Sequence, residues 1–251
     1  MATYLIRKLE QFTQLSSEDK QKLERAAAAK VRVVRPREDI IREGDKPRQV
    51  NLILDGWACR YKVLEDGRRQ IVGFLVPGDV CDIRMFILKQ IDHSMGALTP
   101  VRVAEIPSDT LLDVIDTSPR LTRAMWWNSL VEESISREWT TSLGQREAIE
   151  RLSHLFCELY FRLKAVGLTE NGQGRKSFEF PVTQDQLADA TGMSTVHVNR
   201  TLQLMREQEL IIWKGKTVTI PDLEALMSVA MFNANYLHLD RDGHELDANE
   251  P

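Results

Sequence analysis

The stretch PVTQDQLADATGMSTVHVNRTLQLMREQELI, residues 181–211, decides the fold of the C-terminal part of this chain. Thr183 and Gln186 stand at the spacing of a capping box and open a short helix. Gly192 can adopt the left-handed backbone that other residues resist, so the chain turns there. We expect a second helix to begin at about Ser194, whose hydroxyl can cap it.

The small and apolar residues of this stretch fit two helices that cross closely. Ala188 is a small residue four positions before the glycine, where the two helices approach each other. The residues expected in the shared core are Leu187, Met193, Val198 and Leu202. A helix, a short turn with a glycine and a second helix form the helix-turn-helix of DNA-binding proteins.

A β-hairpin follows directly in LIIWKGKTVTIPD, residues 210–222. Its tip is Lys214-Gly215-Lys216, so two lysines flank a tight turn. Lysines beside a recognition helix bind backbone phosphates, which adds affinity without sequence information. The alternative is an ordinary solvated turn. Together, the two helices and the hairpin predict a winged helix-turn-helix.

The second helix carries polar residues and one valine on the face opposite its core. The candidates for reading bases are Thr195, Val196, Asn199 and Arg200. An arginine pairs with guanine through two hydrogen bonds, and the methyl groups of a valine contact a thymine methyl. The candidates for phosphate contacts are Thr183, Ser194, His197, Lys214 and Lys216. The alternative for the histidine is packing at the side of the helix.

Residues 31–106 have a different texture, with short β-like runs separated by turns. Glycines punctuate these runs, and Asp66-Gly67 is a hairpin signal between two of them. Strands this short and this regularly spaced predict a small β-roll, or jelly roll, instead of a parallel α/β sheet. Before them, Ser16 and Asp19 at capping-box spacing open a helix.

A long helix is predicted to begin at Pro119, after a short helix over residues 108–116. One of its faces carries a stripe at three-to-four-residue spacing that we assign to contact with a second copy of the chain. The stripe comprises Leu121, Met125, Asn128, Val131, Glu132, Ile135 and Trp139. The alternative is that the same stripe packs on the β-roll of its own chain.

The chain beyond Gly144, a predicted hinge, contains a second amphipathic helix that ends near Gly167. The segment TENGQGRKS, residues 169–177, is polar and rich in turn residues, which predicts an exposed loop. A compact α/β unit is expected over residues 178–238, and the acidic residues after it predict a solvated tail.

The composition is that of an ordinary globular protein. The 251 residues are 43% hydrophobic and 28% charged, with a formal net charge of −4. This balance excludes a histone-like protein, but a local basic patch can still steer nucleic acid. Neither a signal peptide nor a run of about 18 apolar residues is present, so we expect no membrane partner.

The three cysteines, Cys59, Cys81 and Cys157, lie far apart and form no CxxC pair. Their spacing fits neither a zinc site nor a disulfide framework. We therefore expect no metal, no cofactor and a reducing cytoplasm as the setting.

These motifs together resemble those of the Crp/Fnr family of bacterial transcription regulators. GQREAIERLSHLFCELYFRL, from Gly144, is similar to the helix that opens the DNA-binding domain in that family. GKTVTIPDLEAL, from Gly215, is similar to the family's terminal wing. The β-roll adds glycine signals at Gly44-Asp45, Gly56 and Gly78-Asp79, so the resemblance covers nearly the whole chain.

The resemblance implies an α+β fold with four parts. These are a cyclic-nucleotide-binding-like β-roll over residues 1–118, a dimerisation helix over 119–143, a winged helix-turn-helix over 144–238 and a flexible acidic tail over 239–251. It also implies a homodimer that places two recognition helices in successive major grooves of near-palindromic double-stranded DNA. RNA polymerase is an implied further partner. In the family's best-known members the position of Val196 is a glutamate that accepts from cytosine, so valine predicts a changed base preference.

The candidate effector pocket departs from the family pattern. The cyclic-nucleotide binders of the family hold the ribose with a Gly-Glu pair and the phosphate with an Arg-Ser pair. By ungapped alignment, this chain has Asp82-Ile83 and His93-Ser94 at those places. Loss of the arginine removes the two-pronged donor that suits a phosphate, and Arg84 stands at the other end of the loop. We therefore expect no cyclic-nucleotide binding, and the effector stays unknown.

This chain also lacks the residues that other members of the family use to sense oxygen or to bind haem. No cysteine precedes Cys59, whereas the oxygen-sensing branch holds an iron–sulfur cluster with N-terminal cysteines. His93 is the only histidine of the β-roll, and a lone histidine is more often structural than a haem ligand. Cys157 lies in an apolar-flanked helix and is expected to be buried instead of sensing oxidation. The chain resembles the FixK-like or a related subgroup of the family, and several FixK-like regulators act without a ligand.

Two other classes of function compete with DNA-binding regulation. An enzyme on a cupin-like β-roll needs several histidines converging on a metal, and this β-roll has only one. A sensing or interaction module that no longer bound DNA would be free to lose Arg200 and the lysines of the wing. We therefore predict a sequence-specific transcription regulator and no enzyme.

Overall fold

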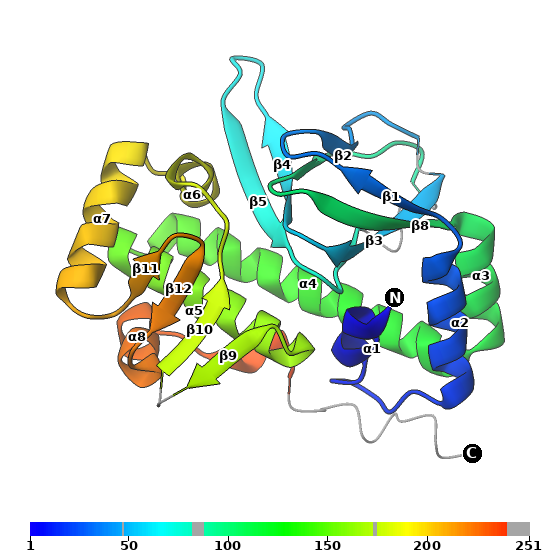
Figure 1. Cartoon of the computed structure of the whole chain (residues 1–251). Helices are drawn as coiled ribbons and strands as arrows, with labels where there is room; N and C mark the ends of the chain where they lie inside the picture. The colour runs from blue at the N-terminus through cyan, green and yellow to red at the C-terminus, as the bar shows by residue number, and fades with distance from the viewer. Residues whose placement is uncertain (47, 82–87, 173–174, 240–251) are drawn as a thin grey trace. The chain divides into compact units, whose positions relative to one another are not determined.

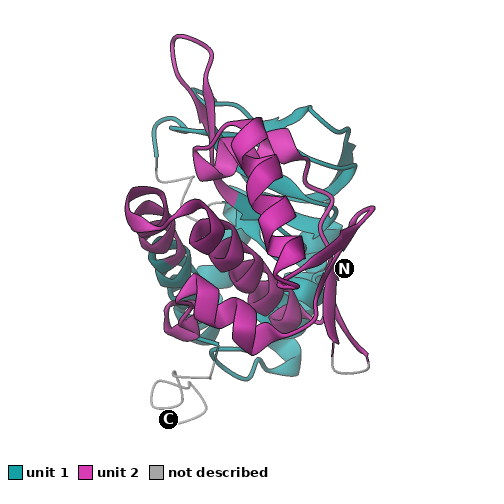
Figure 2. Cartoon of the chain, turned by 90° about the vertical axis from the view of Figure 1, so that its left-hand side faces the viewer, with its two compact units in different colours: residues 1–61, 74–134, 238–251 teal, residues 62–73, 135–237 magenta. Residues whose placement is uncertain are grey.

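The computed structural model describes residues 1–46, 48–81, 88–172 and 175–239 (Figure 1). The chain divides into two compact units, which Figure 2 distinguishes by colour. Unit 1 contains Met1–Tyr61, Phe74–Ser134 and the chain from His238, and unit 2 contains Lys62–Gly73 and Ile135–Leu237.

Two four-stranded sheets form the β-roll, with strand orders β1-β8-β3-β6 and β2-β7-β4-β5 (Figure 1). The strands are β1 (Val31–Val34), β2 (Asp39–Ile41), β3 (Gln49–Asp55), β4 (Ala58–Val63), β5 (Arg69–Leu75), β6 (Val80–Cys81), β7 (Ser94–Ala97) and β8 (Val101–Pro107). The predicted β-roll is confirmed. The hairpin signal Asp66-Gly67 lies between β4 and β5, where Gly67 has a φ of +86°.

Alternate side chains along the strands of the β-roll pack into two different apolar cores. Ile53, Met95 and Val103 come from three strands of the two sheets and belong to the apolar core between them. The neighbours of Ile53 on β3, Leu52 and Leu54, belong instead to a second core with the helices. Successive residues of a strand point to opposite faces, so one strand serves both cores.

The helices of unit 1 cover the outer face of the first sheet. They are α1 (Thr3–Leu9), α2 (Ser17–Ala28), α3 (Ser108–Thr117) and the first part of α4 (Pro119–Gln145). The capping box of Ser16 and Asp19 is present, as predicted. Asp19 also accepts a hydrogen bond from Ser118 Oγ at 2.6 Å, which joins α2 to the start of α4. Burial opposes ionisation of Asp19, but the hydrogen bonds from Ser118 and Ser16 hold its pKa below the ordinary value.

Helix α4 is continuous through the predicted hinge. Gly144 lies in its last turn, so the hinge prediction is misplaced, and the chain leaves the helix at Arg146 and Glu147. Glu147 and Glu150 form a capping box that begins the next helix. The break therefore comes where a new helix is capped and not at the glycine.

Besides the end of α4 and the hairpin residues Lys62–Gly73, unit 2 contains a helical layer and one four-stranded sheet of order β11-β12-β10-β9 (Figure 1). Its helices are α5 (Ala148–Val166), α6 (Gln184–Thr191), α7 (Thr195–Glu207), α8 (Leu223–Ala230) and the 3-10 helix η2 (Ala234–Leu237). Its strands are β9 (Thr169–Gly172), β10 (Arg175–Glu179), β11 (Ile212–Lys214) and β12 (Thr217–Ile220).

The prediction of a loop over residues 169–177 is wrong for its described residues, although the predicted exposure holds for Glu170, Asn171, Gly172 and Arg175. Residues 169–172 lie in β9 and residues 175–177 in β10, and β10 also pairs with the distant strand β12, with Phe178 opposite Val218. Both of these side chains are buried. The polar turn residues of this segment did not predict strand β10, because its partner strand β12 lies about forty residues further along the chain.

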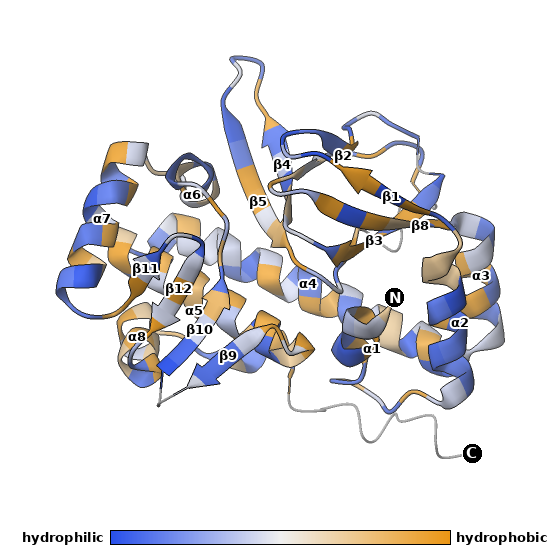
Figure 3. Cartoon of the chain, in the orientation of Figure 1, coloured by the Kyte–Doolittle hydropathy of each residue, from blue (hydrophilic) through white to orange (hydrophobic). Residues whose placement is uncertain are grey.

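The hydropathy of the residues shows which helices have one apolar and one polar face. In Figure 3, hydrophobic bands alternate with hydrophilic ones along α7, as expected for an amphipathic helix on a core. Among the helices that the structure describes, none is both long enough and apolar enough to span a membrane.

Candidate nucleic-acid interface

The helix-turn-helix is built as the sequence predicts. The Thr183 hydroxyl accepts from Gln186 N and the Gln186 side chain accepts from Thr183 N, which completes the capping box of α6. Gly192 follows α6 with a φ of +66°, the left-handed region that favours glycine. Ser194 then caps α7 by accepting a hydrogen bond from His197 N at 3.2 Å. These contacts fix the angle at which the second helix leaves the turn.

One face of α7 is fully buried. Val198, Leu202 and Met205 have no exposed surface, and the adjacent Thr201 is also buried. Leu187 and Ala188 of α6 are buried as well, so the predicted core between the helices is present, except that Met193 is only half-buried. The buried face leaves the opposite face of α7 free to meet another molecule.

The candidates for base reading lie on this opposite face. Thr195, Val196 and Arg200 are exposed, and Asn199 is half-buried between them and the core. Val196 is 80% exposed, which nothing in the packing of the chain requires. Gln203, one turn beyond Arg200, is also exposed on this side. Sequence reasoning missed Gln203, although the helical spacing from Val196 and Arg200 indicated it.

Two base-reading candidates are held by side chains of α6 that sequence reasoning missed. Thr195 Oγ1 donates to Asp185 Oδ1 at 2.8 Å. Asn199 Nδ2 donates to Gln184 Oε1 at 3.0 Å. No spacing rule predicts these pairs, because they depend on how α6 and α7 cross.

The candidates for phosphate contact are exposed as well. Thr183, Ser194 and His197 are exposed around the helix N-termini, where they take part in capping. Lys214 and Lys216 are exposed on either side of Gly215, which has a φ of +58° at the tip of the β11–β12 hairpin. The predicted wing is therefore present, with both lysines in solvent.

The buried carboxylate of Glu158 links α5 to other elements of unit 2, the unit that also contains α6 and α7. Glu158 of α5 accepts hydrogen bonds from Trp139 Nε1 at 3.1 Å, from Arg162 Nη1 at 3.1 Å and from Tyr236 OH at 3.2 Å. Burial raises the pKa of Glu158, and Arg162, Trp139 and Tyr236 oppose that shift. Since Trp139 lies near the end of α4 and Tyr236 in η2, one side chain connects three elements of unit 2.

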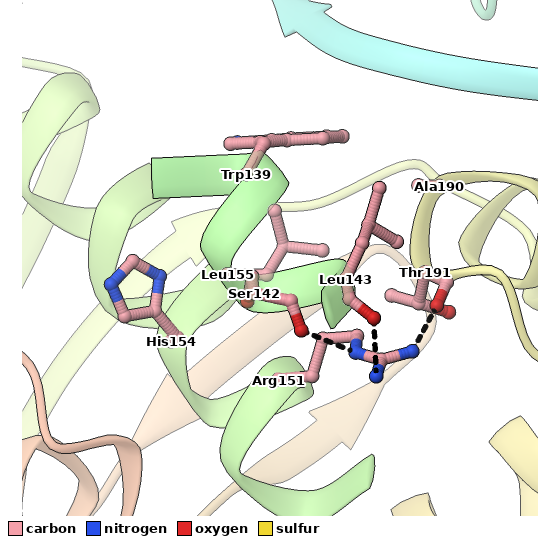
Figure 4. A pocket seen from close by; sticks show the side chains of 8 residues that line it. All are labelled: Trp139, Ser142, Leu143, Arg151, His154, Leu155, Ala190 and Thr191. Atoms are coloured by element: carbon pink, nitrogen blue, oxygen red, sulfur yellow. Dashed lines mark hydrogen bonds between the residues drawn. The ribbon is translucent and has the colours of Figure 1, made fainter. Parts of the chain in front are cut away.

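Arg151 makes a second connection within unit 2, shown in Figure 4. Its guanidinium donates to the carbonyl oxygens of Ser142 at 3.0 Å, Leu143 at 3.2 Å and Arg146 at 2.8 Å. It also donates to Thr191 O, at the end of α6, at 2.6 Å. Carbonyls at helix ends lack partners within the helix, so one arginine completes the ends of α4 and α6 together. The adjacent hollow has an empty volume of about 280 Å³, part of it open to solvent.

The stripe assigned to dimer contact is largely buried within the chain itself. Leu121 and Met125 belong to the core of unit 1, and Asn128, Val131 and Trp139 are also buried. These five side chains are at most 8% exposed in the single chain, so their assignment to contact with a second copy is corrected. Ile135 is half-buried.

Glu132 is likewise engaged within unit 1. It forms ion pairs with Arg60 Nη2 at 2.6 Å and Lys8 Nζ at 3.4 Å. The most exposed apolar residues of α4 are instead Trp126, at 66% exposure, and Leu130, at 60%. Sequence spacing alone did not distinguish the buried face of α4 from its exposed face, because apolar residues recur every three to four positions on both.

The candidate effector pocket is only partly within the described residues. Asp82, Ile83 and Arg84 lie outside them. His93 Nδ1 lies 2.8 Å from a carboxylate oxygen of Asp92, and Ser94 Oγ accepts from the backbone N–H of residue 43 at 3.0 Å. Both side chains of the pair are thus engaged with neighbouring residues.

The cysteines are free thiols in buried positions. Burial raises the pKa of Cys157 to about 12, so this thiol stays protonated at neutral pH. Since the thiolate is the reactive form, Cys157 is an inert core residue. Within the part of the chain that the structure describes, no group of three or more histidine, cysteine or acidic side chains could hold a metal ion.

Comparison with known proteins assigns both parts of the chain. Residues 31–118 match the cyclic nucleotide-binding domain, and residues 150–229 match the Crp-like helix-turn-helix domain. The chain is 27% identical over 192 residues to the transcriptional activator protein FnrL of Cereibacter sphaeroides, with 76% of each chain covered. It is 28% identical over 189 residues to a probable transcriptional activator of Rhizobium leguminosarum bv. viciae, with 75% of this chain and 76% of that protein covered.

A solved structure shares the fold. FixK2 from Bradyrhizobium japonicum superposes with a TM-score of 0.71 at 22% identity, and the match covers 82% of this chain and 98% of that chain.

Proposed function

Since the chain belongs to the Crp/Fnr family of DNA-binding transcription regulators, we propose that it binds a near-palindromic promoter site as a homodimer. One recognition helix, α7, enters the major groove of each half-site. The site of action is promoter DNA in the cytoplasm, with RNA polymerase as a further partner. The chain regulates transcription and catalyses no reaction.

The exposed face of α7 carries this proposal. On this face, Val196 is 80% exposed and lies one helical turn from the exposed Arg200. A major groove offers what both side chains need, because thymine presents a methyl group and guanine presents two acceptors. We assign the guanine contact to Arg200 and the thymine contact to Val196.

The phosphate contacts come from the ends of the helices and from the wing. Lys214 and Lys216 are exposed on a turn that two paired strands hold in place. We assign them to the DNA backbone, where a lysine adds affinity for any sequence. Thr183, Ser194 and His197 are further candidates for the same backbone.

The dimer contact is assigned to the exposed face of α4. Trp126 and Leu130 are four residues apart, and the exposed Glu133 follows after three, which is the spacing of a coiled-coil seam. Large apolar side chains with this exposure become buried when two copies of the helix pack together. The stripe read from the sequence lies on the opposite side of the helix and stabilises the chain's own core.

We also propose that DNA binding needs no cyclic nucleotide. The two residues that stand where the family binds the cyclic phosphate are His93 and Ser94, and both have partners within the chain. Neither offers the fixed pair of donors that an arginine gives a phosphate.

DNA binding by the purified full-length chain tests the proposal. The chain is titrated at low salt against promoter fragments of its own genome and against a scrambled fragment, with no small molecule added. We expect a subset of fragments to bind at least about a thousandfold more tightly than the scrambled one. Absence of any DNA binding at low salt would overturn the proposed function and favour an interaction module on the same fold.

A further inference from the structure

We propose that Asp185 and Gln184, at the start of α6, set the base preference of the recognition helix. They do so by fixing the side chains of Thr195 and Asn199, without contacting a base themselves. This inference rests on the proposed function, since it concerns how α7 reads DNA. It adds two positioning residues and names the base chemistry that they select.

The first contact decides which part of Thr195 faces the groove. Its hydroxyl donates to Asp185 Oδ1 at 2.8 Å, although both residues are exposed. A threonine side chain carries one hydroxyl and one methyl group on the same carbon, so holding the hydroxyl fixes the methyl too. The carboxylate takes up the only donor of this side chain.

The consequence is an apolar surface at the start of α7. Thr195 and Val196 are adjacent in the sequence and both are exposed, so with the Thr195 hydroxyl held by Asp185 the methyl groups of the two residues are the parts left for the groove. Neither group can hydrogen-bond to a base edge. Both fit the 5-methyl group of thymine, which is the apolar feature of the major groove. We therefore infer that each half-site contains thymine opposite this pair of residues.

The second contact decides how Asn199 presents its amide. Nδ2 donates one N–H to Gln184 Oε1 at 3.0 Å. The second N–H and the carbonyl oxygen remain for DNA, and this donor–acceptor pair matches N7 and the amino group of adenine. Gln184 thus fixes the plane of the amide before DNA arrives.

The negative charge of Asp185 predicts a second effect, on the affinity for DNA of any sequence. A carboxylate beside a DNA-reading face repels phosphates and lowers the affinity for every sequence. Asp185→Asn removes this charge but keeps an oxygen that can accept from Thr195. Asp185→Ala removes both. The two variants therefore separate the positioning role from the electrostatic one.

The experiment replaces thymine by deoxyuridine, which removes only the 5-methyl group. An operator is first selected with the wild-type full-length chain, and each thymine of one half-site is then replaced in turn. At the position read by Thr195, we expect the wild type to lose about fourfold in affinity, the equivalent of one buried methyl group. Thr195→Val should keep this discrimination, and Thr195→Ser should lose it.

The Asp185 variants complete the test. Asp185→Ala should lose the discrimination between thymine and deoxyuridine, whereas Asp185→Asn should keep it. Both should bind scrambled DNA more tightly than the wild type, because both have lost the carboxylate. Gln184→Ala should broaden the preference for adenine in the selected operator, while Gln184→Glu, which keeps an acceptor, should not.

The outcomes distinguish failure of this inference from failure of the proposed function. If the wild type selects no operator, the proposed function is wrong and this inference falls with it. If the wild type selects an operator but Thr195→Ser discriminates like the wild type and Thr195→Val does not, the hydroxyl reads the base. In that case the inference is wrong and the proposed function stands.

Discussion

The β-roll and the winged helix-turn-helix keep different parts of their family's design. The β-roll buries Ile53 and Met95 between two sheets, but the pair at the cyclic-phosphate position is His93 and Ser94. The winged helix-turn-helix keeps its core, its caps, its wing and an exposed Arg200. The difference teaches that apolar alternation maintains a fold, while a few polar side chains decide what it binds. Under the proposed function, the β-roll needs no cyclic nucleotide while the winged helix-turn-helix reads DNA.

The two halves also differ in what holds them together, and the largest predicted effect tests that difference. In unit 2, Glu158→Ala removes the fully buried carboxylate that accepts hydrogen bonds from Trp139, Arg162 and Tyr236. We expect a loss of about 3–5 kcal/mol in the free energy of unfolding of unit 2. Hydrogen exchange, which resolves the two units, measures it.

The matched change in the β-roll is Ile53→Val, which removes one methylene from an apolar core. It should cost only about 0.5–1.5 kcal/mol in unit 1. Glu170→Ala, at an exposed position of β9, is the control for loss of a carboxylate in unit 2. Equal effects of Glu158→Ala and Glu170→Ala would show that the buried network contributes no stability.

The second prediction concerns the reading face itself. Arg200→Ala should abolish specific promoter binding, because an arginine–guanine contact contributes about 1–3 kcal/mol and a dimer makes it twice. Arg206→Ala, at an exposed arginine of the same helix, should keep the sequence preference. Competition between a promoter fragment and scrambled DNA measures both. Full discrimination by Arg200→Ala would remove Arg200 from the reading face.

The third prediction tests which face of α4 joins two copies. Leu130→Glu should weaken self-association by at least about tenfold, because burial of a leucine contributes about 1.5–3 kcal/mol. The fold should be unaffected, since Leu130 is exposed in the single chain. Sedimentation gives the monomer–dimer constant.

The control for this prediction is Leu112→Glu, at an exposed leucine of α3 outside the proposed seam. It should leave the monomer–dimer constant unchanged. If Leu130→Glu dimerises like the wild type, the contact lies elsewhere on the chain.

The smallest predicted effect concerns the wing. Lys214→Ala and Lys216→Ala should weaken binding evenly across DNA sequences and each reduce the slope of log K against log salt by about one. Titrations at several salt concentrations give the slope. A variant that changes the base preference instead would place its lysine against a base edge.

Much of the reading half could be predicted because its signals are local. Thr183 with Gln186, Gly192 and Ser194 each act on neighbouring residues, so their spacing predicts the turn and the caps. The wing and the Asp66-Gly67 hairpin were predictable for the same reason.

The wrong predictions concern residues whose structure depends on contacts with distant segments of the chain. The strand β10 forms because β12 is available to pair with it, and residues 169–177 alone do not contain that information. A helical stripe predicts burial without naming what covers it, so Leu121 and Met125 were assigned to a partner when their own core covers them. The contacts of Gln184 and Asp185 depend on the crossing of α6 and α7, which no spacing rule gives.

The central claim is that the purified chain reads a dimeric DNA site by itself, and selection from a random DNA pool tests it most directly. The full-length chain is incubated with random duplexes at moderate salt without any small molecule, and the bound DNA is sequenced over several rounds. We predict two inverted half-sites about one helical turn apart, each with guanine and thymine at fixed positions. A pool that stays random, or that converges on a single half-site, would contradict the account.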